Sequence, residues 1–131
     1  MPTIFSKIVD GQIPCYKIAE DHRYLAFLDI NPLVVGHTLV IPKEETDYLF
    51  DVDDVALSEM MVFAKRVALA IEKVVTCKRI GVVVLGLEVP HAHIHLVPLN
   101  SESDINFSNE RVSLTAEEFN KLSENIRNKL V

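Results

Sequence analysis

The chain has 131 residues and a formal net charge of −6; 49% of its residues are hydrophobic and 24% are charged. This length and composition are typical of one folded, globular domain, residues 1–131, and exclude a disordered or membrane-spanning chain. The acidic balance and the scattered lysines and arginines argue against nucleic-acid binding, which depends on a concentrated positive surface.

The N-terminal part of the sequence predicts one helix and three extended segments. A short helix at 4–9 ends at Asp10-Gly11, and an extended piece follows at 15–19. A strand at 22–30 leads through a turn into a second strand at 37–42. The first of these strands alternates, with Tyr24, Ala26 and Leu28 on one face and Leu25, Phe27 and Asp29 on the other.

A long helix is predicted from 51 to about 75, because the hydrophobic period changes there and the first turn is rich in aspartate. Its apolar residues cover more of the helix than one buried face requires. The helix is therefore either packed centrally or shared between the core and a partner subunit, and we expect a homodimer.

The C-terminal part predicts two more strands, at 79–87 and 91–99, and a last helix at about 115–130. Thr115 and Glu118 have the spacing of a capping box that opens this helix. Neighbouring strands with short connections favour antiparallel pairing. We therefore expect an α+β fold, with a mainly antiparallel five-stranded sheet, a long central helix and a C-terminal helix.

Signals for membranes and secretion are weak. The longest apolar run, "IGVVVLGL" at 80–87, is far shorter than the roughly 20 residues that cross a bilayer. The first residues are interrupted by proline and charged residues and lack a signal-peptide core. Cys15 and Cys77 have no metal-binding or redox spacing and fit a reducing compartment. We expect a cytoplasmic protein that does not bind membranes.

Three histidines, His91, His93 and His95, alternate with apolar residues. On a strand, all three side chains would point to one side, about 6.7 Å apart. They could form a polar face turned to solvent, or bind a metal with His22 or His37 as a third ligand. They could also act on phosphorus, because a neutral imidazole is a nucleophile and charged neighbours stabilise phosphate oxygens.

The sequence resembles the histidine-triad (HIT) family of nucleotide hydrolases and transferases over most of residues 4–99. The segment "HAHIHLV" matches the family signature His-φ-His-φ-His-φ-φ, where φ is apolar. The chain is most similar to the histidine-triad nucleotide-binding (Hint-like) branch, whose members are mostly homodimeric purine-nucleoside phosphoramidases. Other matching segments occur in the family's order: "IFSKIVDGQIP", "LAFLDINP", "GHTLVIPKE" and "GLEVPHAHIHLVPL".

The resemblance implies a role for each matching residue. His93 would be the nucleophile at the α-phosphorus of a purine nucleotide, forming a covalent nucleotidyl-histidine intermediate. His91 and His95 would orient it and bind phosphate, and His37 would support the triad. Asp29 would accept the ribose hydroxyls. The base would pack against Ile30, in an apolar slot completed by Phe5, Ile8 and Leu28.

The sequence also departs from the family pattern. Many bacterial relatives place two cysteines and a histidine of a structural zinc site where this chain has Thr3, Ser6 and Glu45. Oxygen groups of this kind suit zinc poorly, so we expect no structural metal and no cofactor. In the stretch "GVVVLGLEVP" at 81–90, Leu87 stands where relatives carry glutamine and there is no asparagine, so Glu88 is the nearest polar substitute.

These departures leave the reaction open. The resemblance favours hydrolysis at the α-phosphate of nucleoside phosphoramidates or related conjugates. Dinucleoside-polyphosphate hydrolysis and nucleotidyl transfer use the same covalent chemistry. A nucleotide-binding module with little turnover is a further alternative, favoured by the missing amide side chains.

Overall fold

A computed structural model describes residues 2–131 and contains one five-stranded sheet with the order β1-β2-β3-β5-β4. Every neighbouring pair of strands is antiparallel. The strands are β1 (Lys17–Glu20), β2 (Tyr24–Leu28), β3 (Thr38–Pro42), β4 (Arg79–Val83) and β5 (Ile94–Leu99). The helices are α1 (Ile4–Val9), α2 (Asp54–Glu72) and α3 (Ala116–Arg127), with short 3-10 helices η1 (Leu49–Asp51) and η2 (Glu102–Ile105). The expected α+β architecture is confirmed.

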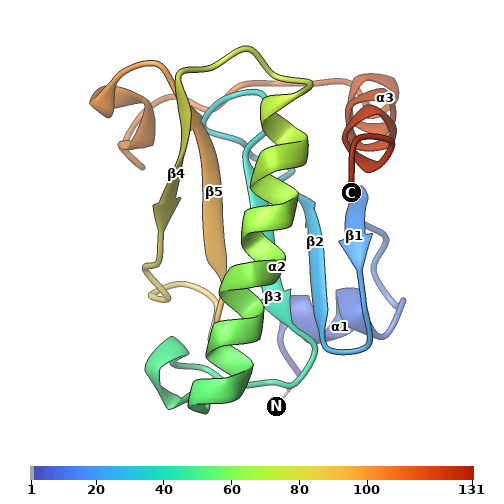
Figure 1. Ribbon diagram of the computed structural model, residues 1–131, viewed down its shortest axis with the longest axis vertical. Helices are drawn as coiled ribbons and strands as arrows, with labels where there is room; N and C mark the ends of the chain where they lie inside the picture. The colour runs from blue at the N-terminus through green and yellow to red at the C-terminus, as the bar shows by residue number, and fades with distance from the viewer. Residues whose placement is uncertain (1) are drawn as a thin grey trace.

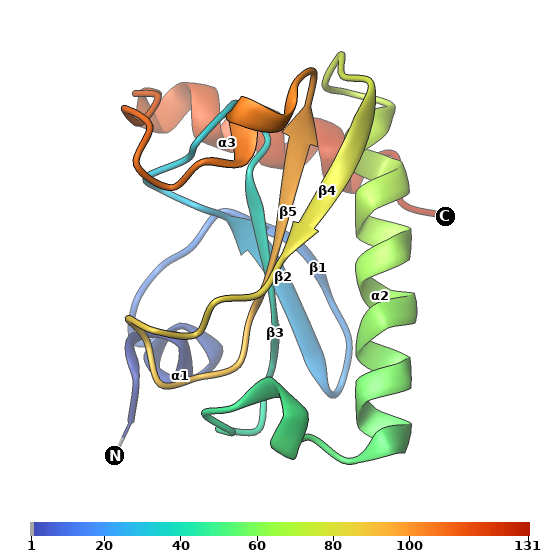
Figure 2. The same ribbon diagram turned by 90° about the vertical axis from the view of Figure 1, so that its left-hand side faces the viewer.

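Both faces of the sheet are covered. Helix α2 crosses one face, with α3 beside β1 (Figure 1), and α1 lies on the opposite side (Figure 2). As the alternation predicted, Tyr24 and Leu28 of β2 join the core under α2, whereas Leu25 and Phe27 join a second cluster that includes Phe5 of α1. Burial of every residue of β2 and β3 follows from this two-sided packing.

Helix α2 is shorter than the predicted range of 51 to about 75, because Leu49–Asp51 form η1 and the helix ends at Glu72. Asp53 caps α2 by accepting a hydrogen bond from the Ala56 N–H at 2.9 Å. Thr115 and Glu118 form the predicted capping box at the start of α3. Helix α3 is also held to β1's side of the sheet, because Phe119 stacks on Tyr16 with 4.8 Å between ring centroids. Among residues 2–131, none of the helices combines the length and apolarity that a bilayer crossing demands.

The strands predicted at 79–87 and 91–99 are shorter than expected, because β4 ends at Val83 and β5 begins at Ile94. Gly86 adopts a positive φ of 71°, and Pro90 has no N–H for strand pairing. The backbone N–H groups of His91 and Ala92 donate to loop carbonyls instead of a neighbouring strand. The prediction that all three histidines lie on one strand was therefore wrong: only His95 does.

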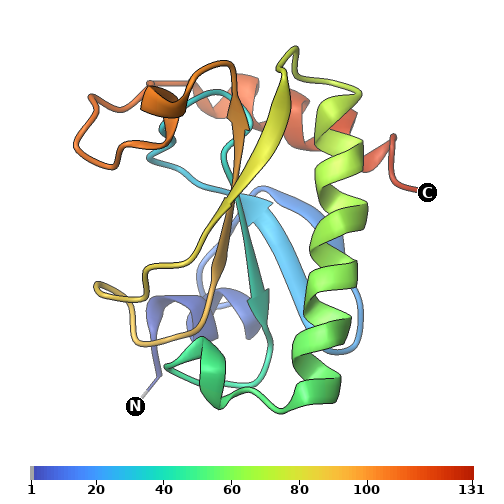
Figure 3. The same cartoon turned by 60° about the vertical axis from the view of Figure 1, so that its left-hand side comes forward.

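Two segments project from the sheet on the side opposite α2. One connects β4 to β5, and the other, at 100–113, follows β5 and contains η2. Figure 3 shows both on the same side as α1. Residues far apart in the sequence therefore surround one region of the sheet face.

Candidate active site

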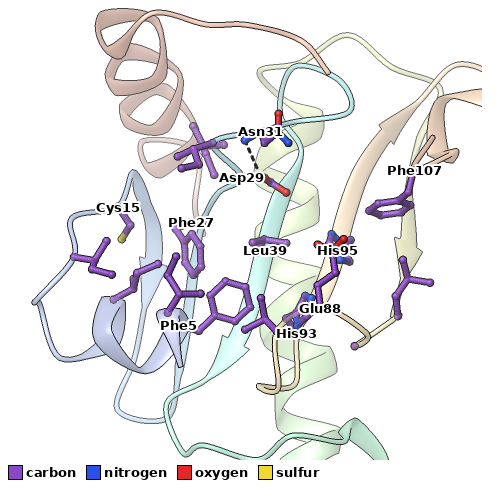
Figure 4. A pocket seen from close by; sticks show the side chains of 18 of the residues that line it. Phe5, Cys15, Phe27, Asp29, Asn31, Leu39, Glu88, His93, His95 and Phe107 are labelled. Carbon is purple, nitrogen blue, oxygen red and sulfur yellow. Dashed lines mark hydrogen bonds between the residues drawn. The ribbon is translucent and has the colours of Figure 1, made fainter. Parts of the chain in front are cut away.

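A cavity of about 430 Å³ opens between α1, the end of β2 and the two projecting segments. Figure 4 shows His93, His95 and Asp29 at its polar side and aromatic residues of α1 and β2 at its apolar side. The cavity is lined by most residues predicted for the site: His93, His95, Asp29, Ile30, Phe5, Ile8, Leu28 and Glu88. His37 and His91 are fully buried and do not line it.

The environment of His93 determines which of its nitrogens carries a proton. Its Nδ1 lies 2.7 Å from the carbonyl oxygen of His91. Because a carbonyl only accepts hydrogen bonds, Nδ1 carries the proton and Nε2 of the neutral ring has a free lone pair. Burial lowers the pKa of His93, which keeps the ring neutral at pH 7. Phe5 packs edge-on against this ring, with 5.0 Å between centroids.

A chain of hydrogen bonds determines the tautomer of His95. The N–H of Leu33 donates to His37 Nδ1 at 3.0 Å, so the proton of neutral His37 is on Nε2. His37 Nε2 lies 2.9 Å from His95 Nδ1 and donates to it. His95 therefore carries its own proton on Nε2. Burial lowers the pKa of His37 to about 3 and that of His95 to about 4, so both rings are neutral at pH 7.

The two rings that line the cavity are thus chemically complementary. His93 offers a lone pair, and His95 offers an N–H donor. Their centroids are 5.0 Å apart and their planes meet at 67°. This is closer than the spacing expected for a regular strand, because His93 precedes β5. At this spacing His93 can attack an electrophilic atom while His95 donates a hydrogen bond to an oxygen bonded to that atom.

Asp29 follows β2 directly, and its carboxylate lines the cavity. One oxygen accepts the Asn31 N–H at 2.8 Å, and the other lies 3.6 Å from His37 Nε2. Burial raises the pKa of this carboxyl group. Ile30, the next residue, is 71% exposed and lies at the cavity mouth, where it could cover a flat ligand.

Within the described part of the chain, one group of side chains could hold a metal ion: Asp29, His37 and His95. Their candidate ligand atoms lie within 4.8 Å of one another. The nitrogens that would bind the ion are, however, hydrogen-bonded to each other at 2.9 Å. An ion could enter only after this bond opened. His22, the alternative third ligand considered from the sequence, is exposed and lies outside this cavity.

His91 belongs to a second, buried polar cluster. Its Nε2 donates to the Pro42 carbonyl at 2.8 Å, and its Nδ1 accepts from the Thr3 hydroxyl at 3.1 Å. Both ring nitrogens are therefore occupied, and the expected contact of His91 with phosphate is not supported. The ring turns toward α1 because His91 lies in a loop before β5. Its link to the cavity is its carbonyl group, which orients His93.

The cluster around His91 also contains the residues at the zinc positions of bacterial relatives. Glu45 accepts hydrogen bonds from the Thr3 N–H and the Ser6 hydroxyl, both at 2.9 Å. Thr3 Oγ1 in turn accepts the Ser6 N–H at 3.0 Å. These residues provide oxygen donors and one imidazole whose nitrogens are already paired. Such a set does not fit a structural zinc, which prefers thiolate and imidazole ligands.

Phe107 and Arg111 are among the cavity residues that were not predicted from the sequence. Phe107 stands edge-on to His95, with 4.9 Å between ring centroids. Arg111 lines the same wall and donates to the carbonyls of Asn31 at 3.0 Å and of Phe107 at 3.3 Å. Both lie in the segment after β5, which is polar, carries no recognised motif and was expected to be only a surface connection.

The sheet, the buried histidines and the neutral pair facing the cavity define a histidine-triad domain. Residues 10–102 match the HIT domain family. The chain belongs to the HIT family, which confirms the resemblance found in the sequence.

Individual relatives cover nearly the whole chain. An uncharacterized HIT-like protein of Borreliella burgdorferi is 37% identical over 92% of this chain and 92% of its own length. An adenosine 5'-monophosphoramidase of Schizosaccharomyces pombe is 36% identical over 99% of each chain. A crystal structure of a Hit-like protein from Bartonella henselae has a TM-score of 0.83 and 29% identity, covering 98% of this chain and 96% of that one.

Proposed function

We propose that this protein is a nucleotide hydrolase that cleaves at the α-phosphate of purine-nucleoside phosphoramidates or related nucleotide conjugates. The observation that carries the proposal is the hydrogen bond from His93 Nδ1 to the His91 carbonyl, which leaves a nucleophilic nitrogen in a cavity of about 430 Å³. Similarity to the S. pombe adenosine 5'-monophosphoramidase supports the choice of substrate.

The reaction would proceed in two steps. His93 Nε2 attacks the α-phosphorus, the bond from phosphorus to the leaving nitrogen or oxygen breaks, and the leaving group takes up a proton. The nucleotidyl-imidazole carries positive charge, which the His91 carbonyl stabilises through Nδ1–H, as an acceptor does beside a catalytic imidazolium. Water then attacks phosphorus, the bond from phosphorus to His93 Nε2 breaks and the nucleoside monophosphate leaves; the proton that the water loses balances the one taken up by the leaving group. The Nε2–H of His95 would donate to a non-bridging oxygen in both steps.

The nucleoside would lie toward the apolar side of the cavity. Asp29 can accept hydrogen bonds from both ribose hydroxyls, because a carboxylate has two acceptor oxygens. Phe5 and Ile8 of α1 form the wall against which a purine base would stack, and the exposed Ile30 would cover the base from the mouth. Leu28 lines the cavity but is buried, and its side chain joins the core under α2.

The role of His93 can be tested with adenosine phosphoramidate as substrate. The His93→Ala variant is expected to lose about a thousandfold or more of kcat, because the covalent route requires its nitrogen. His22→Ala removes an exposed imidazole outside the cavity and should keep wild-type activity. Wild-type enzyme denatured at alkaline pH during turnover should carry the added mass of a nucleotidyl group, because the phosphorus–nitrogen bond to histidine is labile in acid. Equal turnover by His93→Ala and wild type would refute the assignment.

A specific observation favours the alternative of a binding module with little turnover. Leu87, at the position of the family's glutamine, is 89% exposed and has no hydrogen-bond donor in its side chain. Tight AMP binding together with negligible hydrolysis would decide for this alternative. Product analysis with dinucleoside polyphosphates and with phosphoramidates would separate the two hydrolase activities.

We also propose a homodimer formed through α2 and β4. Val55, Val62 and Leu69 recur every seven residues along α2 and are between 48% and 68% exposed. Strand β4 is an edge of the sheet, so its free backbone groups can pair with another strand. A second copy of the chain would cover both features through a twofold axis.

Molar mass measured by light scattering tests the dimer. Wild type is expected at twice the chain mass, and Val62→Glu should shift it toward the monomer because it places a charge in the apolar seam. Asn120→Glu adds the same charge on the exposed face of α3 and should leave the mass unchanged. A monomeric wild type at high micromolar concentration would refute the proposal.

A further inference from the structure

The wall of the cavity beside His95 is built by the segment that follows β5. Phe107 contacts His95 edge-on at 4.9 Å and His37 at 6.1 Å between centroids. In Figure 4 Phe107 lies next to His95. Phe107 and Arg111 lie beyond residues 10–102, the part that matches the HIT domain family. The match to the family therefore does not describe this wall.

Two main-chain carbonyl groups position Arg111 at this wall. Its Nη1 donates to the Asn31 carbonyl at 3.0 Å and its Nη2 to the Phe107 carbonyl at 3.3 Å. Its guanidinium carbon also lies 5.5 Å from the centre of the Phe107 ring. A guanidinium has five N–H groups, so three remain for a ligand after these two bonds. The side chain is thus oriented in advance by main-chain atoms of two different segments.

A cavity that binds phosphate needs a positively charged group, and Arg111 provides one. Among the described lining residues, Arg111 is the one with a permanent positive charge, while Asp29 and Glu88 are carboxylates. His93 and His95 are neutral at pH 7 because burial lowers their pKa values. The segment 84–88, "VLGLE", has no side-chain donor when Glu88 is ionised. Without Arg111, a phosphate would face only negative and neutral side chains.

The contacts of Arg111 place it beside the reacting groups, because Asn31 lies two residues after Asp29 and Phe107 packs against His95. After burial, which is the larger cause, the positive charge of Arg111 further lowers the pKa of His37 and His95. Burial raises the pKa of Asp29, and Arg111 partly offsets this. Arg111 therefore acts on the side of the cavity where His95 and Asp29 meet, which is where a 5'-phosphate joined to a ribose would lie.

We propose that Arg111, clamped by the carbonyls of Asn31 and Phe107, is a phosphate-binding residue that holds the anionic group of the nucleotide against His95. It supplies the charge that the segment between β4 and β5 does not offer. This inference rests on the proposed function, because it assumes a nucleotide in this cavity. A guanidinium suits the role, since its planar N–H groups match phosphate oxygens.

The test compares AMP with adenosine, which differ in the phosphate. Binding of each is measured by NMR titration, which also reads millimolar affinities, for wild type, Arg111→Gln and Glu110→Gln. Arg111→Gln is expected to weaken AMP binding about 10- to 100-fold, the range for a lost charged hydrogen bond, and to leave adenosine binding unchanged. Arg111→Lys keeps the charge and should recover part of the loss. Glu110→Gln, at an exposed neighbour, should not weaken AMP binding.

Three results would overturn the proposal in distinguishable ways. An equal loss for AMP and adenosine, with Arg111→Gln still folded, would show that Arg111 only supports the cavity wall. Unchanged AMP binding in Arg111→Gln would place its charge outside the phosphate site. Failure of wild type to bind either ligand would refute the proposed nucleotide function itself.

Discussion

The cluster around His91 makes a sharp prediction about Thr3. The Thr3 hydroxyl caps α1 by accepting the Ser6 N–H at 3.0 Å, and it donates to His91 Nδ1 at 3.1 Å. Thr3→Val removes the hydroxyl and replaces it with a methyl group of similar size. The first turn of α1 then loses its cap, and a fully buried ring nitrogen loses its partner.

The expected cost can be worked out from these two contacts. Loss of a helix cap costs about 0.5–2 kcal/mol. A buried acceptor left without a donor costs about 1–3 kcal/mol. Because both losses occur together, Thr3→Val should lower the free energy of unfolding by about 2–4 kcal/mol, a large part of the roughly 5–15 kcal/mol typical of a folded protein.

Urea unfolding at pH 8 measures this change. With an m-value of about 2 kcal/mol/M, the midpoint of Thr3→Val should fall by roughly 1–2 M. Thr3→Ser keeps the hydroxyl and serves as the matched control, so its midpoint should stay close to wild type. If the valine and serine variants unfolded within about 0.5 kcal/mol of each other, the hydrogen-bonded role of Thr3 would be refuted.

Two further predictions concern the folded state as a whole. Because the pKa of His37 is about 3 and that of His95 about 4 in the folded protein, below the usual 6.5, the unfolded chain binds more protons under mildly acidic conditions. The free energy of unfolding is therefore not reduced by these rings above about pH 7, and it decreases as the pH falls toward 3–4. At pH 5 each ring has lowered it by about 2 kcal/mol. Gly36→Ala should lower stability by about 2–4 kcal/mol, because Gly36 has a φ of +96° and a Cβ would lie 3.0 Å from Val75 and 3.1 Å from Pro98.

Each of these predictions has a matched control. For the pH effect, urea unfolding at pH 8 and pH 5 is compared between wild type and His37→Asn; an equal loss in both would contradict the assignment to the buried ring. For Gly36, the control is Gly11→Ala, where φ is +79° but a Cβ meets nothing within 4 Å. A Gly36→Ala variant as stable as Gly11→Ala would rule out the packing contribution.

Local chemistry in the sequence determined much of this protein. The helix at 4–9 was predicted with its observed bounds, and the alternation along β2 assigned each side chain to the correct face of the sheet. The capping box at Thr115 also formed as predicted. These features depend on neighbours a few residues away, so they can be read without a fold. The histidine signature likewise identified the HIT family.

Tertiary structure alone decided how the histidines are used. Leu33 and His37 set the tautomer of His95, and Thr3 and Pro42 occupy the ring of His91. Arg111 joins a cavity whose other walls come from α1, the end of β2 and the segment between β4 and β5. No spacing in the sequence signals these contacts, because they join segments separated by up to 88 positions. Which nitrogen carries a proton depends on the donor or acceptor that folding brings to it, and that partner exists only in the folded chain.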